Sequence, residues 1–218
     1  DAISYDRGYG SYKNFFDVFP DGKISEEKHI YKMRLFTKEK VIEPLLSSLK
    51  YEKFENEQTS LIVPDYSETD FSIYPRVADD ENPMQRLWSD GAWMKAYLAH
   101  GCYWHKCAFC DVSLDYVASY RLVQIENLFH GLKSQSEKNG IHGIHFVDEA
   151  MPPAAMLKFS KLNLKHSASF SFWGNVRFEK VYSRDIAEFL SSGGLIGVSG
   201  GIEIATGTGL DSISKGTD

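Results

Sequence analysis

The chain has 218 residues, of which 43% are hydrophobic and 25% charged, a globular composition with enough length for one substantial core. Its net charge of -6 and its pI of about 5.7 give no electrostatic reason to expect nucleic-acid binding. No apolar run approaches the roughly 20 residues of a membrane span, so we expect no membrane partner.

Residues 1–60 are predicted to form a small α+β or irregular segment that caps a larger domain. Asp1–Asp6 could end a strand, and the aromatic-rich stretch Tyr12–Phe19 could form a short helix that stops at the turn signal Pro20-Asp21-Gly22. The run Glu52–Ser60 is polar, so we expect it to be exposed. Both ends of the chain look cut, which predicts a piece of a longer protein.

Residues 61–94 have the composition of a linker. They contain three prolines and many acidic residues, which favours an irregular path over a surface. Trp88 and Trp93 stand near the end of this stretch. Their expected role is to anchor the linker against the domain that follows.

From Lys95 onward the hydrophobic pattern alternates between strands and helices. The expected strands are Ala96–Ala99, Ile141–Val147, Ser167–Trp173 and Leu195–Ile202. The expected helices are one from Ile125 that ends before Gly140, one after Pro152-Pro153, and one capped by Ser183 and closed by Gly193-Gly194. This alternation predicts an α/β fold with a parallel sheet, truncated after about four βα units.

Polar residues follow each of the expected strands. In parallel βα folds, functional side chains collect at the carboxyl ends of the strands. The four sets, in chain order, are Cys102, Cys107 and Cys110; Asp148 and Glu149; Asn175 and Arg177; and Glu203. We therefore expect these side chains to surround one opening.

The three cysteines are predicted to be ligands of one soft metal centre. Their spacing is C-x4-C-x2-C, and a 4Fe–4S cluster held by three cysteines leaves one iron open to a small molecule. The alternative is zinc held by the three thiols and His105, in a structural or interaction module without catalysis. A thiolate site needs a reducing compartment, which favours the cytoplasm. Trp104 and His105, inside the loop, either shield the centre or face substrate.

These residues resemble the radical S-adenosylmethionine (radical SAM) superfamily, and in particular its subgroup associated with cobalamin-binding domains. In that family a three-cysteine loop follows the first strand of a partial (β/α)6 TIM-like barrel, usually with the spacing C-x3-C-x2-C. This chain has one extra residue between Cys102 and Cys107. The resemblance covers residues 61–218 and implies that 95–218 form the N-terminal part of such a barrel.

The resemblance implies an enzyme in which a 4Fe–4S cluster on the three cysteines reductively cleaves SAM to a 5′-deoxyadenosyl radical. Phe109 matches a position near the adenine. Asp148 and Glu149 of FVDEAMP take the place of a motif that holds the SAM amino group. Asn175 and Arg177 of SFWGNVRFE match a segment whose arginine sits near the SAM carboxylate. Glu203 matches an acidic residue that contacts the ribose.

The resemblance also implies partners. These are SAM, an electron donor such as a flavodoxin or ferredoxin, and a substrate that the sequence leaves unidentified. DAISYDRGYG resembles the end of a cobalamin-binding-type domain, so cobalamin would bind only in a longer protein. Plainer interpretations stay open: Asp148 and Glu149 could cap the next helix, Arg177 could form a surface ion pair, and Glu203 could be solvated on a loop.

Overall fold

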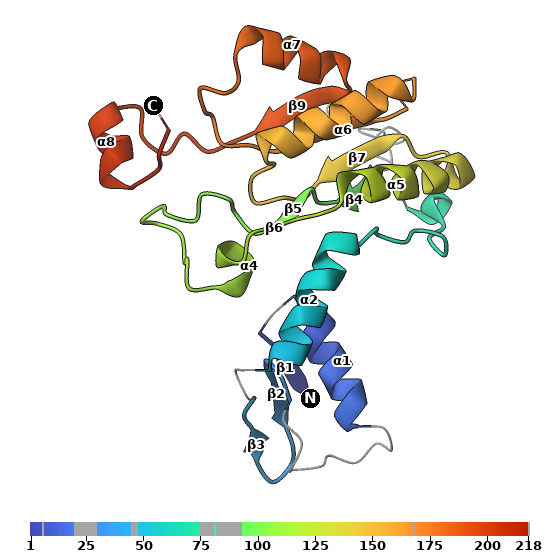
Figure 1. The fold of residues 1–218 in the computed structure, drawn as a ribbon, viewed down its shortest axis with the longest axis vertical. Helices are drawn as coiled ribbons and strands as arrows, with labels where there is room; N and C mark the ends of the chain where they lie inside the picture. The colour runs from blue at the N-terminus through green and yellow to red at the C-terminus, as the bar shows by residue number, and fades with distance from the viewer. Residues whose placement is uncertain are drawn as a thin grey trace.

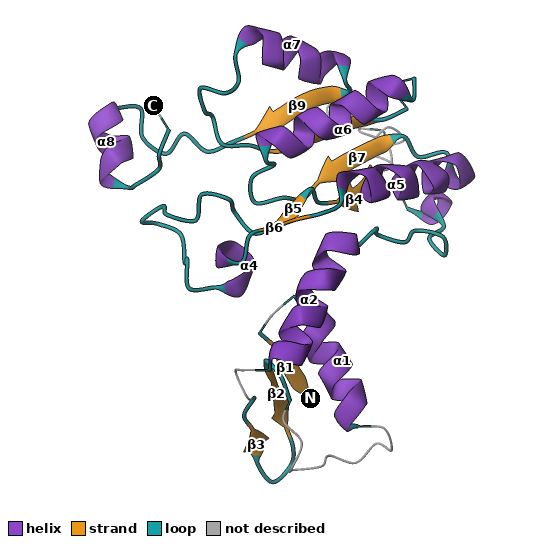
Figure 2. Cartoon of the chain, viewed as in Figure 1, coloured by secondary structure: helices purple, strands orange, loops and turns teal. Residues whose placement is uncertain are grey.

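The computed structural model describes residues 1–5, 7–19, 30–44, 48–74, 81, 93–167 and 169–217. Figure 1 shows an N-terminal unit, a connecting segment and a larger α/β unit that carries the rest of the described chain. Figure 2 shows the same view by secondary structure, with long loops on the side of the α/β unit where α8 (Gly207–Ser212) lies.

The N-terminal unit combines an antiparallel sheet with helices. Strands β1 (Ala2–Ser4), β2 (Met33–Phe36) and β3 (Val41–Ile42) pair in that order, beside α1 (Tyr9–Val18) and α2 (Leu49–Leu61). The strand expected within Asp1–Asp6 and the helix expected over Tyr12–Phe19 are confirmed. The turn signal Pro20-Asp21-Gly22 lies outside the described residues.

The prediction that Glu52–Ser60 is exposed is wrong. The run forms most of α2, and Glu55 and Thr59 on that helix are buried. The Glu55 carboxylate accepts the N–H of Gly10 and lies 3.6 Å from Nε of Arg7, while Arg7 Nη1 donates to the Thr59 hydroxyl at 2.8 Å. These polar contacts with the start of α1 turn one polar face of α2 inward.

The parallel sheet consists of β4 (Trp93–Ala96), β7 (Gly143–Phe146), β8 (Ser171–Asn175) and β9 (Leu195–Ser199), in that order. Helices α5 (Ile125–Asn139), α6 (Pro153–Lys165) and α7 (Arg184–Ser192) connect the strands and lie along one face of the sheet (Figure 1). The predicted α/β alternation and parallel pairing are confirmed. Closure into a partial TIM-like barrel stays a prediction.

The first sheet strand lies earlier than predicted. β4 ends at Ala96, where the expected strand Ala96–Ala99 begins, and Ala99 instead opens a short strand β5 (Ala99–His100). The Asp148 carboxylate accepts the N–H groups of Leu98 and Ala99 at 2.8–3.1 Å. Because these amides bind a side chain, the parallel ladder stops before them.

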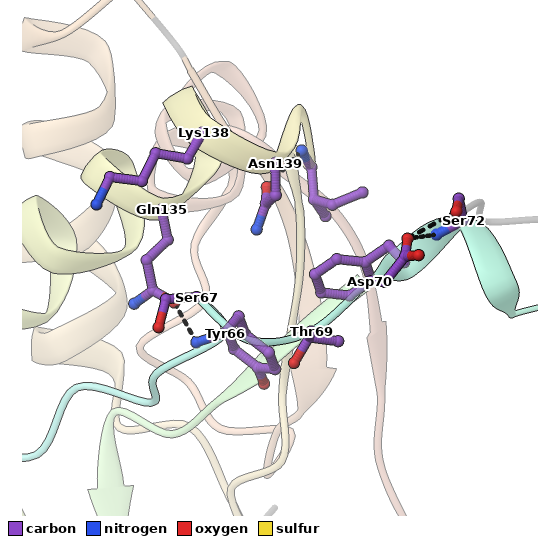
Figure 3. Close-up of a pocket in the computed structure, with 10 residues that line it drawn as sticks. Tyr66, Ser67, Thr69, Asp70, Ser72, Gln135, Lys138 and Asn139 are labelled. Carbon is purple, nitrogen blue, oxygen red and sulfur yellow. Dashed lines mark hydrogen bonds between the residues drawn. The ribbon is translucent and has the colours of Figure 1, made fainter.

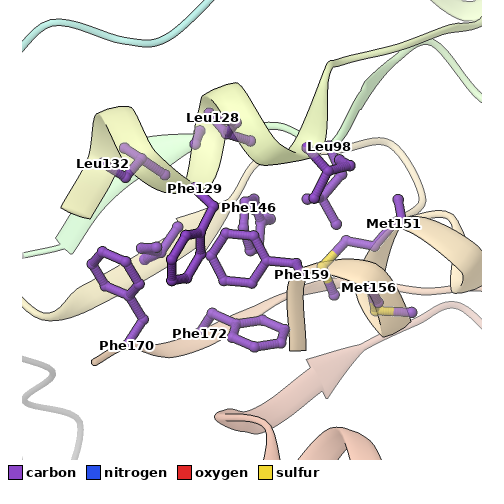
Figure 4. Close-up of a cluster of buried hydrophobic side chains, with 14 of the residues drawn as sticks. Leu98, Leu128, Phe129, Leu132, Phe146, Met151, Met156, Phe159, Phe170 and Phe172 are labelled. Carbon is purple, nitrogen blue, oxygen red and sulfur yellow. The ribbon is translucent and has the colours of Figure 1, made fainter. Parts of the chain in front are cut away.

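A continuous apolar core fixes the sheet under its helices. Phe146 of β7 and Phe172 of β8 are fully buried, with ring centroids 5.1 Å and 5.3 Å from Phe159 of α6. Figure 4 shows these rings packed between the sheet and the helices, with Leu128 and Leu132 of α5 above them. Burying large side chains in this way holds the strand ends in fixed positions.

Candidate functional site

The cysteine loop is the head of a β-hairpin. Strand β5 pairs antiparallel with β6 (Arg121–Leu122), and residues 101–120 form the connection between them, including the short helix α4 (Asp115–Ala118). The N–H of Cys102 donates to the Val117 carbonyl at 3.1 Å, which closes the base of the loop. Gly101 has φ +73°, and a Cβ there would lie 2.9 Å from the Ser119 carbonyl oxygen, so the turn into the loop requires glycine.

The extra residue between Cys102 and Cys107 is accommodated by a left-handed turn. His105 has φ +38°, a conformation in which histidine is enriched among non-glycine residues. Its Nδ1 lies 2.9 Å from the Cys102 carbonyl oxygen. Because a carbonyl can only accept, Nδ1 carries the proton and donates, which ties the first gap of the loop to its own backbone.

One cavity of about 290 Å³ lies at the carboxyl ends of the parallel strands. In Figure 1 the arrows of β7 and β9 point to the side where α8 and the cysteine loop lie. The lining of this cavity includes residues that the sequence predicted for the site: Cys102, Cys107, Phe109, Cys110, Glu149, Asn175, Arg177 and Glu203. The expectation that the polar residues surround one opening is therefore confirmed for all of these residues. The volume of the cavity is near the lower end of the range for small-molecule sites.

The three thiols differ in exposure. Cys107 is buried, Cys102 is half-buried and Cys110 is exposed. The thiol of Cys110 lies within hydrogen-bonding reach of Cys107, and partial burial together with the neighbouring Cys107 and Cys102 thiols raises its pKa. Within the described residues, however, no three His, Cys, Asp or Glu side chains converge in a way that could hold a metal ion.

Asp148 is the one predicted cofactor-binding residue that does not line the cavity. Its side chain is buried, where it accepts the N–H groups of Leu98 and Ala99. Burial raises the pKa of Asp148 to about 7, although those two hydrogen bonds act in the opposite direction. The alternative that it caps the following helix is wrong, since α6 begins at Pro153 and its N-cap, Pro152, has no side-chain cap. Asp148 instead fixes the path of the chain into the cysteine hairpin.

Glu149 and Asn175 face the cavity from neighbouring strands. Glu149 is exposed. The Asn175 side-chain amide donates to the Asp148 carbonyl at 3.3 Å, which turns its own carbonyl oxygen away from that contact. Phe109, in the cysteine loop, lines the cavity and is 53% exposed.

Arg177 is buried and already has a partner on each of its nitrogens. Nε donates to Glu179 at 2.8 Å, Nη1 contacts Cys107 Sγ at 3.8 Å, and Nη2 donates to the Lys215 carbonyl at 2.5 Å. Burial acts to lower the pKa of Arg177, but the hydrogen bond and charge of Glu179 outweigh it and the pKa is raised. The interpretation of Arg177 as a surface ion-pair partner is wrong, because the side chain is only 5% exposed.

Glu203 and Lys215 form an ion pair on the cavity wall. Lys215 Nζ lies 2.7 Å from Glu203 and 5.5 Å from the centre of the Phe109 ring. The Lys215 side chain is 8% exposed and that of Glu203 is 29% exposed. Glu203 has φ +57°, a strained conformation that turns the chain after the glycine-rich end of β9.

Sequence reasoning missed Lys215 and Glu179. Glu179 had a usable signal, because residues i and i+2 of an extended segment share one side and Arg177 stands two positions earlier. Lys215 had none, since a lone lysine in a polar segment is most often solvated. Only the return of the chain after α8 brings it to the cavity.

A second hollow, of about 340 Å³, lies at the opposite end of the sheet, between the connecting segment and the end of α5. Figure 3 shows its polar side chains, several of which bind the chain itself. Gln135 accepts from the Tyr66 N–H and donates to the Pro64 carbonyl, and Asp70 accepts from the N–H and hydroxyl of Ser72. The short 3-10 helix η1 (Phe71–Ile73) contributes to the wall of this hollow. The hydrogen bonds of Gln135 and Asp70 hold the connecting segment in place.

No protein-family model matches the chain, and neither a curated protein nor a solved structure shows significant similarity to it. None of the helices formed by the described residues combines the length and apolar character that crossing a bilayer requires.

The donor set can be compared with the two metal centres that the sequence suggests. A single zinc ion needs four donors converged on one point, with Zn–S distances of about 2.3 Å, and the described residues contain no such group. The thiolates of an iron–sulfur cluster bind different irons, so they need only border the same space. Cys102, Cys107 and Cys110 border one cavity, which fits the cluster.

Proposed function

We propose that this chain is part of a radical SAM enzyme. Its 4Fe–4S cluster would be held by Cys102, Cys107 and Cys110, and SAM would bind beside it in the same cavity. The observation that carries the proposal is that three thiols and the charged and polar ends of β7, β8 and β9 line one cavity. These segments are far apart in the sequence, and only the parallel sheet brings them together.

When bound, the cluster supplies the one-electron reduction that cleaves SAM. The residues of the chain orient the ligand. The Glu149 carboxylate and the carbonyl oxygen of Asn175 are acceptors suited to an ammonium group, and Glu203 offers acceptors to ribose hydroxyls. The partly exposed ring of Phe109 is a group on which an adenine ring could stack. All of these groups line the same cavity.

Two cations on the cavity wall would balance the carboxylate of SAM. Lys215 and Arg177 both line the cavity. Arg177 has fixed partners on all its nitrogens, whereas Lys215 is held by Glu203 and can exchange that partner. A carboxylate ligand would compete with Glu203 for the Lys215 ammonium.

Other partners follow from the same proposal. Reduction requires an electron donor such as a flavodoxin or ferredoxin, and the reaction requires a substrate, whose identity no residue of this chain specifies. Cobalamin binding would belong only to a longer protein. The acidic net charge of -6 favours no nucleic-acid partner, and we place the protein in the reducing cytoplasm.

The metal content of the chain tests the proposal. After anaerobic purification and reconstitution with iron and sulfide, we expect a brown protein with about four iron and four sulfide per chain. A colourless protein with one zinc and no iron would contradict it. His105→Ala is the matched variant, because it should keep an iron cluster and release a zinc ion that His105 helps to bind.

A further inference from the structure

The C-terminal segment, residues 207–217, packs directly on the cysteine loop. The N–H of Ala108 donates to the Ile213 carbonyl at 2.8 Å, and the indole N–H of Trp104 donates to the Ser214 carbonyl at 2.8 Å. A Cβ at Gly216 would lie 2.0 Å from the Trp104 ring, so the two segments are in close contact. The loop is therefore held from outside the hairpin, by a segment that follows it by roughly a hundred residues.

Arg177 lies at the centre of this contact. Its guanidinium carbon is 4.7 Å from the centre of the Trp104 ring and 5.8 Å from that of Tyr103, so it stacks on the loop. The same guanidinium contacts Cys107 Sγ and donates to the Lys215 carbonyl. One side chain from the end of β8 thus joins a thiol, the loop aromatics and the C-terminal segment.

We infer that Arg177 is a positioning residue which, with residues 213–217, clamps the cysteine loop and holds the Cys107 thiol toward the cavity. The role of this clamp in holding a cluster ligand rests on the proposed function. The clamp itself consists of contacts within the chain and exists without any cofactor. It gives Arg177 a task in addition to the positive charge that it would contribute near the SAM carboxylate.

The contact with sulfur has a second consequence. A hydrogen bond and a positive charge beside a ligand sulfur stabilise the reduced, more negative state of an iron–sulfur cluster. Arg177 would therefore raise the reduction potential of a cluster bound through Cys107. Lysine carries the charge but lacks the planar fork that reaches Glu179, Cys107 and the Lys215 carbonyl together.

The clamp is tested on the cofactor-free full chain by alkylation with iodoacetamide, followed by mass spectrometry of each cysteine. In the wild type, buried Cys107 should react more slowly than exposed Cys110. Arg177→Gln should speed Cys107 labelling by at least about tenfold, the effect of losing one charge-assisted hydrogen bond. Arg184→Gln is the control, because Arg184 is exposed and pairs with Glu188 along its own helix.

A second variant covers the case in which Arg177→Gln does not fold. Trp104→Phe keeps a ring under Arg177 but removes the N–H that binds the Ser214 carbonyl. It should speed Cys107 labelling by a smaller factor of about threefold. Unchanged Cys107 labelling in the folded variants would overturn the clamp.

The reduction potential shows whether Arg177 acts on the Cys107 sulfur or only supports the loop. It is measured by redox titration of the cluster-loaded full chain. We expect a more negative potential in Arg177→Gln, partial recovery in Arg177→Lys, and the wild-type value in Trp104→Phe. The same potential in all variants would overturn the effect on the cluster. A wild type that takes up no cluster would refute the proposed function, and the labelling result would still decide the clamp.

Discussion

The two ends of the parallel sheet carry hollows of similar size and different chemistry. At the amino ends the hollow of about 340 Å³ is bordered by polar groups such as Gln135 and Asp70, which bind the chain's own backbone. At the carboxyl ends the cavity of about 290 Å³ is bordered by thiols and charged groups, among them the exposed Glu149. Volume alone would not distinguish the two.

The difference follows from how each hollow is built. The amino-end hollow lies between two segments, the connecting segment and the end of α5, and its hydrogen bonds join them. The carboxyl-end cavity gathers the ends of β7, β8 and β9 with the cysteine hairpin and the return after α8. Because the polar groups there are not all needed to hold the chain, they remain available for chemistry.

The largest expected effect is on cluster binding, which should depend on the carboxyl-end cavity and not on the amino-end hollow. Cys107→Ala removes one of the three proposed ligands and should abolish iron and sulfide binding after anaerobic reconstitution. Gln135→Ala, at the amino-end hollow, should bind as much iron and sulfide as the wild type. Equal iron content in Cys107→Ala and wild type would show that the cavity is not the cluster site.

A pH dependence should arise from Asp148, which follows the carboxyl end of β7. Its pKa is raised to about 7 by burial, whereas the ordinary value is 3.8, so between these pH values the folded state keeps a proton that the unfolded state has released. The free energy of unfolding should therefore fall as the pH rises through this range, by up to on the order of 4 kcal/mol.

Asp148→Asn isolates this contribution. Urea unfolding of both proteins at pH 5 and pH 8 should show a decline in the wild type that is largely absent from the variant. Parallel profiles for the two proteins would mean that Asp148 titrates at its ordinary value when buried against Leu98 and Ala99.

The smallest expected effect is on the free energy of unfolding. Gln135→Ala removes the two hydrogen bonds, to the Tyr66 N–H and the Pro64 carbonyl, and should lower the free energy of unfolding by about 1–2 kcal/mol. Lys138→Ala, at the rim of the same hollow, is the control and should change it by less than about 0.5 kcal/mol. If Lys138→Ala lowered the free energy of unfolding as much as Gln135→Ala, the structural role of the Gln135 hydrogen bonds in this hollow would be contradicted.

The sequence predicted the parts of the fold that depend on local pattern. The helices from Ile125, after Pro152 and after Ser183 carry periodic apolar residues or clear caps and breakers, and the structure confirms them. The end of the first sheet strand was missed, because the carboxylate of Asp148, distant in the sequence, binds the amides of Leu98 and Ala99 and ends that ladder before them.

The sequence could predict that the cysteines, Glu149, Asn175 and Glu203 lie close together, because each follows an expected strand of a parallel sheet, and these residues do line one cavity. Their roles stay predictions. The sequence could not show that Arg177 has three partners or that Lys215 enters the cavity. The place of Lys215, and with it the Arg177 contact to the Lys215 carbonyl, depends on the return of the chain after α8, which no local pattern encodes.

The most direct test of the central claim is the electron paramagnetic resonance spectrum of the reduced, cluster-loaded protein with and without SAM. If the cavity holds a cluster with one open iron beside a SAM site, adding SAM should change the spectrum, and adding adenosine alone should not. A spectrum that SAM leaves unchanged, in a protein that has bound four irons, would contradict the account.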